Sequence, residues 1–283
     1  MIEYYTPSMG AGAGSQPAEE DGATLDILQL PDEMQTYAMP ELPDSDKMEG
    51  LTEAVAVLMQ LKEKLNSMEP GCSIDITDLD EPNRELIDQI LGEGEVSAVF
   101  ETTSEARIQE SVLAGVWRVK CLDEHGIIAK DTIEVACIPS LVAKNTFRHA
   151  DRRVDANSES LPEGVLNAPP LLTEINDKVA ECRPGSSPHV INLTLLPQTE
   201  ADLAFLNDRL GKGPVTILSR GYGNCRITST SVQHVWWVQY FNSQDANILN
   251  TLEICGVPEV AKAAVEDIRD SAERLGEILE ACL

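Results

Sequence analysis

A sequence repeat with a fixed offset is the feature that most constrains the fold of this chain. The segment Leu91–Val96 recurs as Leu210–Val215, and the last matched pair is Pro139 with Pro258, so 210 − 91 and 258 − 139 both give 119. No gap is needed between these limits. Two copies are too few for an open solenoid, which needs about three or more repeats. The repeat therefore predicts a duplicated compact unit in which each copy buries one apolar face.

Periodicity predicts the same order of elements in both copies: a helix, a strand, a second helix and four antiparallel strands. In the first copy we expect helices over 51–68 and 80–92 and strands over 74–76, 96–100, 107–111, 116–121 and 127–135. In the second copy we expect helices over 171–182 and 199–211 and strands over 190–195, 215–218, 225–229, 235–241 and 246–254. A terminal helix should begin at Pro258. The predicted class is α+β, a tandem duplicated unit with a C-terminal helix.

Composition divides the chain into four segments: an acidic tail over 1–50, a first unit over 51–148, a linker over 149–169 and a second unit over 170–283. The tail holds eleven acidic residues and one lysine, a net charge of −10. Such a segment buries too little apolar surface to offset the entropy of ordering, which predicts disorder. Apolar residues between its prolines leave a second interpretation open, a short docking segment.

The whole chain carries a formal charge of −27, which argues against binding to nucleic acid or to an anionic membrane surface. Residues 1–14 lack the charged and apolar regions of a signal peptide, and no apolar run reaches the roughly 18–20 residues of a membrane span. We therefore expect a cytoplasmic protein. Its seven cysteines are scattered without CxxC spacing, so we expect reduced thiols and neither a metal nor a cofactor.

One pair of side chains could support covalent chemistry. Cys225 is a candidate nucleophile and His234 a candidate base, an arrangement that acyl transfer or thiol chemistry uses. The positions 119 residues earlier are Ala106 and Gly115, so the first copy lacks the pair. The chain also lacks a GxSxG elbow, an HExxH helix and a P-loop. We expect a protein without catalytic activity, with a thiol-dependent enzyme as the alternative.

The facing of side chains on the strands gives two further expectations. Trp117 and Trp236 lie on a face that is apolar in both copies, which predicts a shared core, whereas the face of Trp237 is apolar only in the second copy. Either the terminal helix covers Trp237 or a partner binds there. The repeated cations Arg107 and Arg226, together with the repeated acids Glu134 and Glu253, predict one buried ion pair in each copy.

Several segments together carry a family resemblance. They are Gly221–Ile227, His234–Trp236, Val238–Asn242 and Thr251–Glu253, with Gly14–Pro17, Leu30–Tyr37 and Pro40–Pro43 in the tail. The chain resembles the HupH/HyaF family of hydrogenase expression/formation proteins. This resemblance implies an accessory protein that helps to mature a nickel–iron uptake hydrogenase and binds its iron–sulfur small subunit before export, with other maturation factors as further partners. It implies no catalytic residues.

The sequence thus predicts a cytoplasmic maturation chaperone whose second unit contacts the immature small subunit. The predicted partner-binding residues are Tyr222, Asn224, Arg226, His234, Trp237, Gln239 and Phe241. Two alternatives come from other functional classes. One is a thiol-dependent enzyme or a sulfur or iron carrier that uses Cys225 and His234. The other is a homo-oligomeric structural module that uses the Trp237 strip on a second copy of itself.

Overall fold

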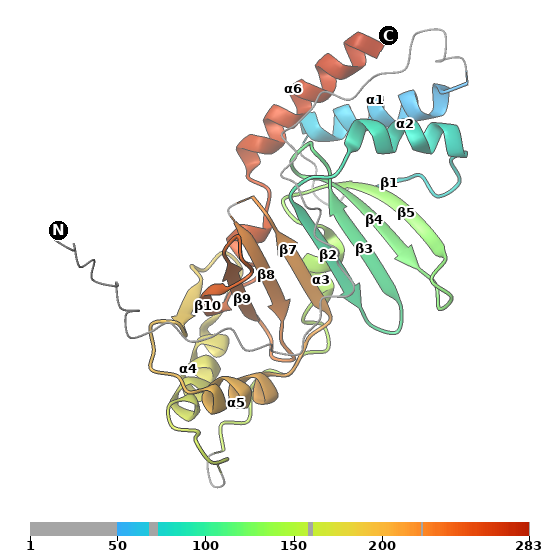
Figure 1. Cartoon of the computed structure of the whole chain (residues 1–283). Helices are drawn as coiled ribbons and strands as arrows, with labels where there is room; N and C mark the ends of the chain where they lie inside the picture. The colour runs from blue at the N-terminus through green and yellow to red at the C-terminus, as the bar shows by residue number, and fades with distance from the viewer. Residues whose placement is uncertain (1–49, 68–72, 158–160, 222, 283) are drawn as a thin grey trace, which may run out of the picture. The chain divides into compact units, whose positions relative to one another are not determined.

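A single antiparallel sheet runs through both halves of the chain in the computed structural model, with the strand order β1-β5-β4-β3-β2-β7-β8-β9-β10-β6 (Figure 1). The structure describes residues 50–67, 73–157, 161–221 and 223–282, which all belong to one unit, Met39–Leu283. Residues 1–49 lie outside the described residues, and the expectation for the acidic tail lies there with them. The mixed helix-and-sheet class is confirmed, whereas the tandem duplication itself stays a prediction.

The first seven elements of the two halves follow the same order, and the halves differ after that. The first half contains α1 (Thr52–Ser67), β1 (Ser73–Asp75), α2 (Glu81–Leu91), β2 (Val96–Glu101), β3 (Glu105–Glu110), β4 (Val116–Leu122), β5 (Ile128–Val135) and α3 (Ser140–Asn145). The second half contains α4 (Ala168–Glu181), β6 (His189–Asn192), α5 (Glu200–Leu210), β7 (Val215–Ser219), β8 (Asn224–Ser229), β9 (Val235–Phe241), β10 (Asn247–Ile254), the 3₁₀ turn η2 (Glu259–Ala261) and α6 (Val265–Cys282).

The expected start of the terminal helix is wrong. Pro258 precedes only the 3₁₀ turn η2, and α6 begins at Val265. Lys262, which closes η2, has an extended backbone with ψ 139°, so the helical path is interrupted before α6 starts. The short helix α3 occupies the position 119 residues before η2.

The centre of the sheet is the pairing of β2 with β7. Ala98 pairs with Ile217, which lies 119 residues further along, and the outer pairs are Val96 with Ser219 and Phe100 with Val215. The register therefore relates the two strands by a local two-fold axis through the Ala98–Ile217 pair. Positions 119 residues apart are called equivalent below.

One face of the sheet, the tryptophan face, carries the shared core. Trp117 and Trp236 are fully buried there, in one cluster with apolar side chains from β2, β3, β7 and β8. Each indole N–H donates to a backbone carbonyl, that of Ala136 at 2.8 Å and that of Gly256 at 3.1 Å. The expectation that both copies share a core on this face is confirmed.

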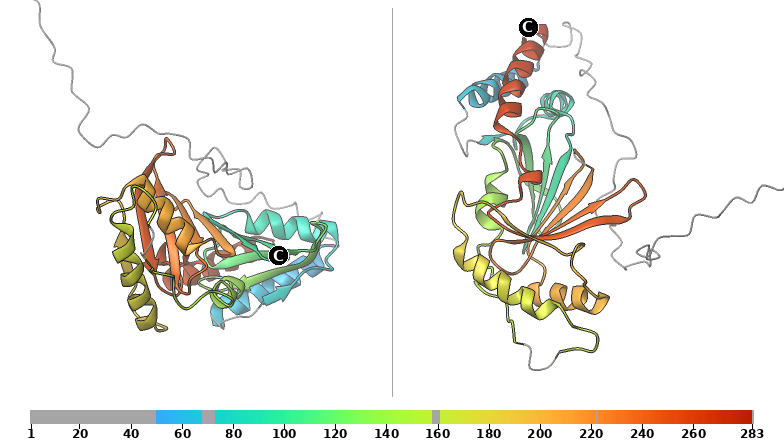
Figure 2. Two further views of the ribbon diagram at one scale, coloured as in Figure 1. Left: turned by 90° about the horizontal axis from the view of Figure 1, so that it is seen from below. Right: turned by 90° about the vertical axis from the view of Figure 1, so that its left-hand side faces the viewer.

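The opposite face carries two separate helical groups, one over each end of the sheet (Figure 2). Helices α1, α2 and α6 pack over the first half, and α4 and α5 pack over the second. Leu275 and Leu279 of α6 belong to the first group. The terminal helix therefore covers the first half of the sheet, and the idea that it covers Trp237 is wrong. Trp237 packs instead against the cluster of α4 and α5.

Within each group, one side chain on the second helix caps the first helix. Asn83 of α2 accepts a hydrogen bond from the N–H of Ala54 in α1 at 2.8 Å. The equivalent residue, Asp202 of α5, accepts from the N–H of Ala168 at the start of α4 at 2.9 Å. Asp202 also forms a capping box with Thr199 at the start of α5. These caps satisfy backbone donors that the helix ends leave without partners.

The two halves differ at one buried position beneath these helices. Arg118 on β4 is bound by Asp131, with one contact at 2.7 Å, and also by Asp88 of α2 at 2.7 Å. The equivalents of these three residues are Trp237, Asn250 and Asn207. The indole N–H of Trp237 donates to the side-chain oxygen of Asn250. A charged cluster in the first half is thus replaced by a neutral hydrogen-bonded pair in the second.

The expected ion pairs between Arg107 and Glu134, and between Arg226 and Glu253, are wrong. Through the intervening β4, Arg107 aligns with Asp131, whereas Glu134 aligns with Trp117, so the two side chains lie on opposite faces. The carboxylate of Glu134 instead accepts hydrogen bonds from the backbone and hydroxyl of Ser140 at the start of α3. Burial raises the pKa of Glu253, and the nearby carboxylate of Glu259 raises it further.

Asp202 generates a prediction about pH. Burial alone would raise its pKa, but N–H groups of Thr199, Leu166, Ala168 and Asn167 outweigh this effect and lower the pKa to about 2. The stabilisation should be full well above the unfolded pKa of 3.8 and lost as pH falls towards 2. We expect Asp202→Asn to lower the free energy of unfolding by about 2 kcal/mol at pH 7 and by about half of that at pH 3. Urea unfolding at pH 7 and pH 3 measures this change in the free energy of unfolding.

The exposed Asp208 on the same helix is the matched control for this test. Asp208→Asn should change the unfolding free energy by less than about 0.5 kcal/mol at either pH. A destabilisation by Asp202→Asn that is equal at both pH values would show that the charge of Asp202 does not contribute.

The difference between Arg118 and its equivalent Trp237 generates a second prediction. Trp237→Arg should destabilise the protein by about 3 kcal/mol, because the new cation meets the neutral Asn250 where Arg118 meets Asp131. Combining Asn250→Asp with Trp237→Arg should restore about 1–3 kcal/mol of the unfolding free energy, because the new carboxylate takes the place that Asp131 has beside Arg118 in the first half. Thermal and urea unfolding of the double-mutant cycle measure both effects.

Gln239→Lys is the control for this cycle, because the equivalent position already holds Lys120. It adds a cation to the same strand and should change stability by less than about 0.5 kcal/mol. Equal stability of Trp237→Arg with and without Asn250→Asp would contradict the idea that a carboxylate at position 250 stabilises a cation at position 237.

Candidate functional site

Four of the predicted partner-binding residues come together on one face of β8 and β9. Asn224 pairs with Phe241, and Arg226 pairs with Gln239. Directly opposed residues of an antiparallel pair point to the same side, so all four lie on the face opposite the tryptophans. Each is partly exposed. The seventh candidate, Tyr222, lies outside the described residues.

Arg226 and Phe241 form the most distinctive contact of this group. The guanidinium carbon of Arg226 lies 5.4 Å from the centre of the Phe241 ring, a cation–π distance. Its Nε atom is buried and has no hydrogen-bond partner among the described residues. No described carboxylate forms an ion pair with Arg226. The arginine is held by a ring, and its charge is not neutralised by another residue that the structure describes.

Residues of the first half extend this surface across the middle of the sheet. The equivalent cation, Arg107 on β3, has a side chain that is 64% exposed and binds Glu105 at 2.6 Å. Between the two arginines lie Val99, opposite Arg107, and Leu218, opposite Arg226, and both of these apolar side chains are buried. We call this region the open face. It comprises Ser97, Val99, Arg107, Gln109, Thr216, Leu218, Asn224, Arg226, Thr228, Gln239 and Phe241.

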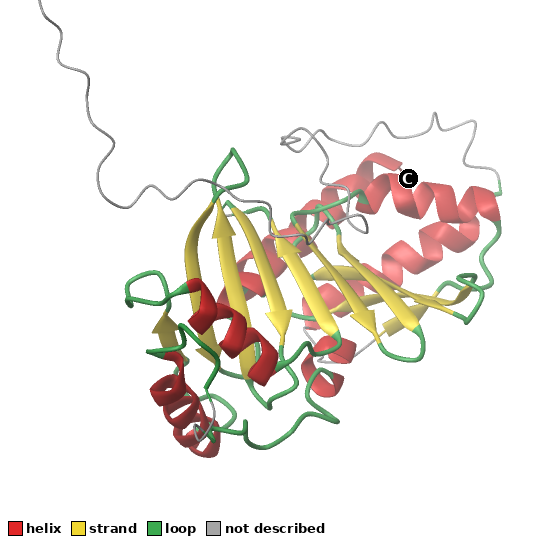
Figure 3. Ribbon diagram, turned by 60° about the horizontal axis from the view of Figure 1, so that its bottom comes forward, coloured by secondary structure: helices red, strands yellow, loops and turns green. Residues whose placement is uncertain are grey.

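The open face lies between the two helical groups. The apolar residues that α1, α2 and α6 cover belong to β1 and β5 and the start of β4, and those that α4 and α5 cover belong to β6, β10 and the start of β9. In Figure 3 no described helix crosses β2, β3, β7 or β8 on this side. The arrangement offers a partly polar floor with a helix group at each end, which suits a polypeptide more than a small molecule.

The remaining two candidates are placed differently. Trp237 lies on the same side of β9 as the open face but packs against the α4 and α5 cluster. His234 lies in the turn before β9 with φ 64°, where its equivalent Gly115 has φ 76°. Its ring contacts Phe147 on the tryptophan side at 5.7 Å between centroids. His234 therefore does not join the other candidates.

Cys225 and His234 do not lie close enough together to act as a nucleophile and its base. Cys225 opposes Tyr240 at one end of the β8–β9 hairpin, and His234 precedes β9 at the other end. At about 3.3 Å per residue their separation is roughly 15–20 Å. Burial raises the pKa of the Cys225 thiol to about 12, although a hydrogen bond with Tyr240 acts in the opposite direction. Burial lowers the pKa of His234. A thiol that stays protonated at neutral pH and lacks a base is a poor nucleophile.

The described residues contain no group of three or more histidine, cysteine, aspartate or glutamate side chains placed to hold a metal ion. None of their helices combines the length and apolar character that a membrane span requires.

Sequence reasoning missed the contribution of the first half to the open face. The sequence predicts a buried ion pair for Arg107, although the repeat makes this residue equivalent to Arg226. The missing information was the register through β3, β4 and β5, which places Arg107 and Glu134 on opposite sides.

Comparisons with known proteins find relatives over most of this chain. The family model for the HupH hydrogenase expression protein, C-terminal conserved region, matches residues 51–159 and 165–282. The hydrogenase expression/formation protein HoxQ of Cupriavidus necator is 46% identical over 99% of this chain and 98% of that protein. HupH of Rhodobacter capsulatus is 44% identical over 99% of each, and the hydrogenase-1 operon protein HyaF of Escherichia coli is 32% identical over 95% and 94%.

A solved structure of the hydrogenase expression protein HupH from Thiobacillus denitrificans is 31% identical. It covers 41% of this chain and 94% of that chain, with a TM-score of 0.37. The family model covers most of the sequence in two adjoining segments, and the curated relatives match over nearly their full lengths. The chain therefore belongs to the HupH family of hydrogenase expression proteins.

Proposed function

We propose that this protein is a cytoplasmic chaperone for maturation of a nickel–iron uptake hydrogenase, and that its open face binds the immature iron–sulfur small subunit before export. Relatives at 44–46% identity carry the name hydrogenase expression/formation protein, which supports a role in hydrogenase maturation. The observation that carries the binding proposal is the open face, with its Arg226–Phe241 contact.

The second half is the better candidate for the main contact. Arg107 in the first half is paired with Glu105, so its charge is largely neutralised. Arg226 is held by the ring of Phe241 and keeps its charge available. Arginine and aromatic side chains are the residue types that most often dominate the energy of protein interfaces. An arginine already ordered by a ring also loses less conformational entropy on binding.

A binding role agrees with the chemistry of the buried thiols. Cys225 and Cys255 lie in the core, and burial raises the pKa of each to about 12. Neither thiol is accessible for exchange with a substrate in this state. The proposed task, keeping a cluster-bearing subunit soluble and protected until assembly, requires only a stable complementary surface.

The binding surface can be tested with two substitutions. We expect Phe241→Ala and Arg226→Glu each to weaken binding of the purified small-subunit precursor by at least about tenfold, because each removes a central anchor. The melting temperature should change little, since both side chains are partly exposed. Titration calorimetry or surface plasmon resonance measures the affinity.

Arg269→Glu, an exposed site on α6, is the matched control for charge reversal and should bind like the parent protein. Undiminished binding by both open-face variants would overturn the assignment of this face. A complex that contains only copies of this chain would support the homo-oligomeric alternative instead.

The thiol alternative can be tested separately. Cys225→Ser keeps a small group that can hydrogen-bond to Tyr240, so a binding protein should retain its function. We expect cells with this variant to produce active hydrogenase within about twofold of the parent level. Cys121→Ser, at a partly buried thiol, serves as a control. Loss of hydrogenase activity in the Cys225 variant, with an unchanged melting temperature, would favour a carrier or enzyme.

A further inference from the structure

A short basic strip interrupts the strongly acidic composition of this protein. Residues 144–153 hold four of the 21 lysines and arginines and one acid, Asp151, in a chain with a net charge of −27. The strip consists of Lys144, Arg148, His149, Arg152 and Arg153. All five side chains are exposed. None forms an ion pair or a side-chain hydrogen bond with another described residue. In so acidic a protein, five neighbouring basic groups without partners among the described residues need an explanation.

The backbone that carries the strip is held at several points. The N–H of Asp151 donates to the carbonyl of Ser231 at 2.8 Å, and the N–H of Gln233 donates back to the carbonyl of Asp151 at 2.8 Å. Val154 is bound through both its N–H and its carbonyl by the side chain of Asn176, each at 2.9 Å. Arg152 and Arg153 therefore sit between two anchored residues, and the cations are presented on an ordered backbone.

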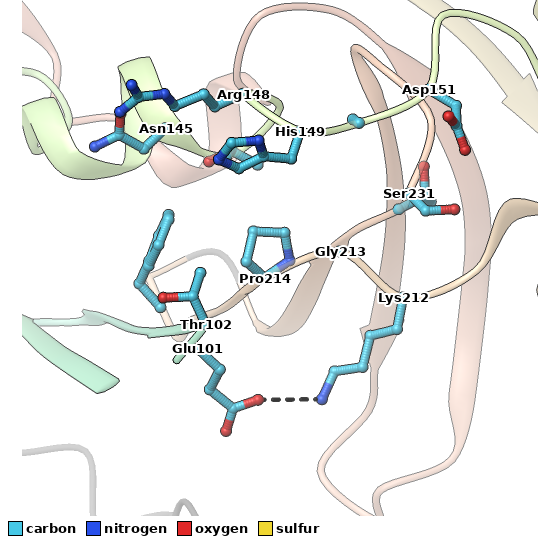
Figure 4. Close-up of a pocket in the computed structure, with 14 residues that line it drawn as sticks. Glu101, Thr102, Asn145, Arg148, His149, Asp151, Lys212, Gly213, Pro214 and Ser231 are labelled. Atoms are coloured by element: carbon cyan, nitrogen blue, oxygen red, sulfur yellow. Dashed lines mark hydrogen bonds and ion pairs between the residues drawn. The ribbon is translucent and has the colours of Figure 1, made fainter. Parts of the chain in front are cut away.

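A pocket opens beside the strip, with a volume of about 510 Å³ (Figure 4). Arg148 and His149 contribute to one wall, and Lys212 lies on the opposite wall. Lys212 contacts Glu101 at 3.4 Å, a long ion pair between exposed groups. Such a pair stabilises the protein little, so an incoming carboxylate can compete for the ammonium. Polar groups of Asn145, Thr102 and Ser231 also line the pocket, together with a second carboxylate, that of Asp151.

We infer that this pocket and the basic strip form a binding site for an acidic peptide segment of a partner protein. Guanidinium groups bind carboxylates through paired, charge-assisted hydrogen bonds. Arg148 and Lys212 line the pocket, whereas Arg152 and Arg153 lie outside its lining. A ligand that meets all of them has to extend from the pocket along the strip, which a chain of carboxylates does and a single small anion does not.

The test uses the full-length protein and a fluorescently labelled oligoglutamate peptide, with binding followed by anisotropy at about 50 mM salt. We expect saturable binding to the parent protein and no binding of an oligoglutamine peptide. The double variant Arg148→Ala/Arg152→Ala should bind at least about tenfold more weakly. The matched control is Lys130→Ala/Arg269→Ala, which removes two exposed cations elsewhere and leaves the same net charge. It should bind within about twofold of the parent.

Three results would overturn the inference. The first is absence of saturable oligoglutamate binding to the parent protein. The second is an equal loss of peptide affinity in the two double variants, which would show that the peptide responds only to the net charge of the protein. The third is complete displacement of the peptide by inorganic phosphate at constant ionic strength, which would assign the pocket to a small anion. Melting curves of all variants confirm that each is folded.

Discussion

The pairing of β2 with β7 is the interaction on which the rest of the structure depends. Each half alone has five strands, and without this pairing β2 and β7 would be exposed edges with unpaired backbone groups. Paired, they bring Ala98 and Ile217 into the middle of a core that contains both buried tryptophans. The remaining edges are short, three residues in β1 and four in β6, which limits unwanted pairing with other chains.

This central pairing also creates the open face. Because β2 and β7 meet directly, the helices of each half pack at opposite ends of the sheet and leave the middle strands between them. The two halves then present different chemistry on one continuous surface. A cation neutralised by Glu105 lies on one side and a cation held by Phe241 on the other. A partner that binds across the centre meets an asymmetric surface, so it is held in one orientation.

The sequence predicted the elements well because their signals are local. Apolar spacing, Pro and Gly at helix ends and the capping pair Thr199–Asp202 all depend on neighbouring residues. The errors concern which elements pack together. The apolar stripe of α6 shows that it must be covered but not by which half, since the hydrophobic effect has no direction. The predicted Arg107–Glu134 pair failed because facing across three strands depends on the turns and on the bulge near Cys121 and Leu122.

Only part of the candidate site could be predicted, because the sequence carries local signals and the site joins distant segments. Alternation along β9 placed Gln239 and Phe241 on one side, because spacing within a strand is a local property, whereas the position of Arg226 on that side needed the register between β8 and β9. The involvement of Arg107 needed the β2–β7 register, and the displacement of His234 needed the turn before β9. The pocket beside the basic strip joins segments about 110 residues apart, such as Glu101 and Lys212, whose proximity no local pattern contains.

Charge places a limit on how the basic strip can act. At a net charge of −27 the protein repels an acidic segment at long range, whereas the strip attracts it only within about 8–10 Å, the screening length at physiological salt. Encounter with a free acidic peptide is therefore slow and its affinity modest. The same segment, carried by a partner already bound at another surface, is presented at a high effective concentration. The strip then adds selectivity for a docked partner, while the first contact has to come from a surface with aromatic and arginine anchors, as on the open face.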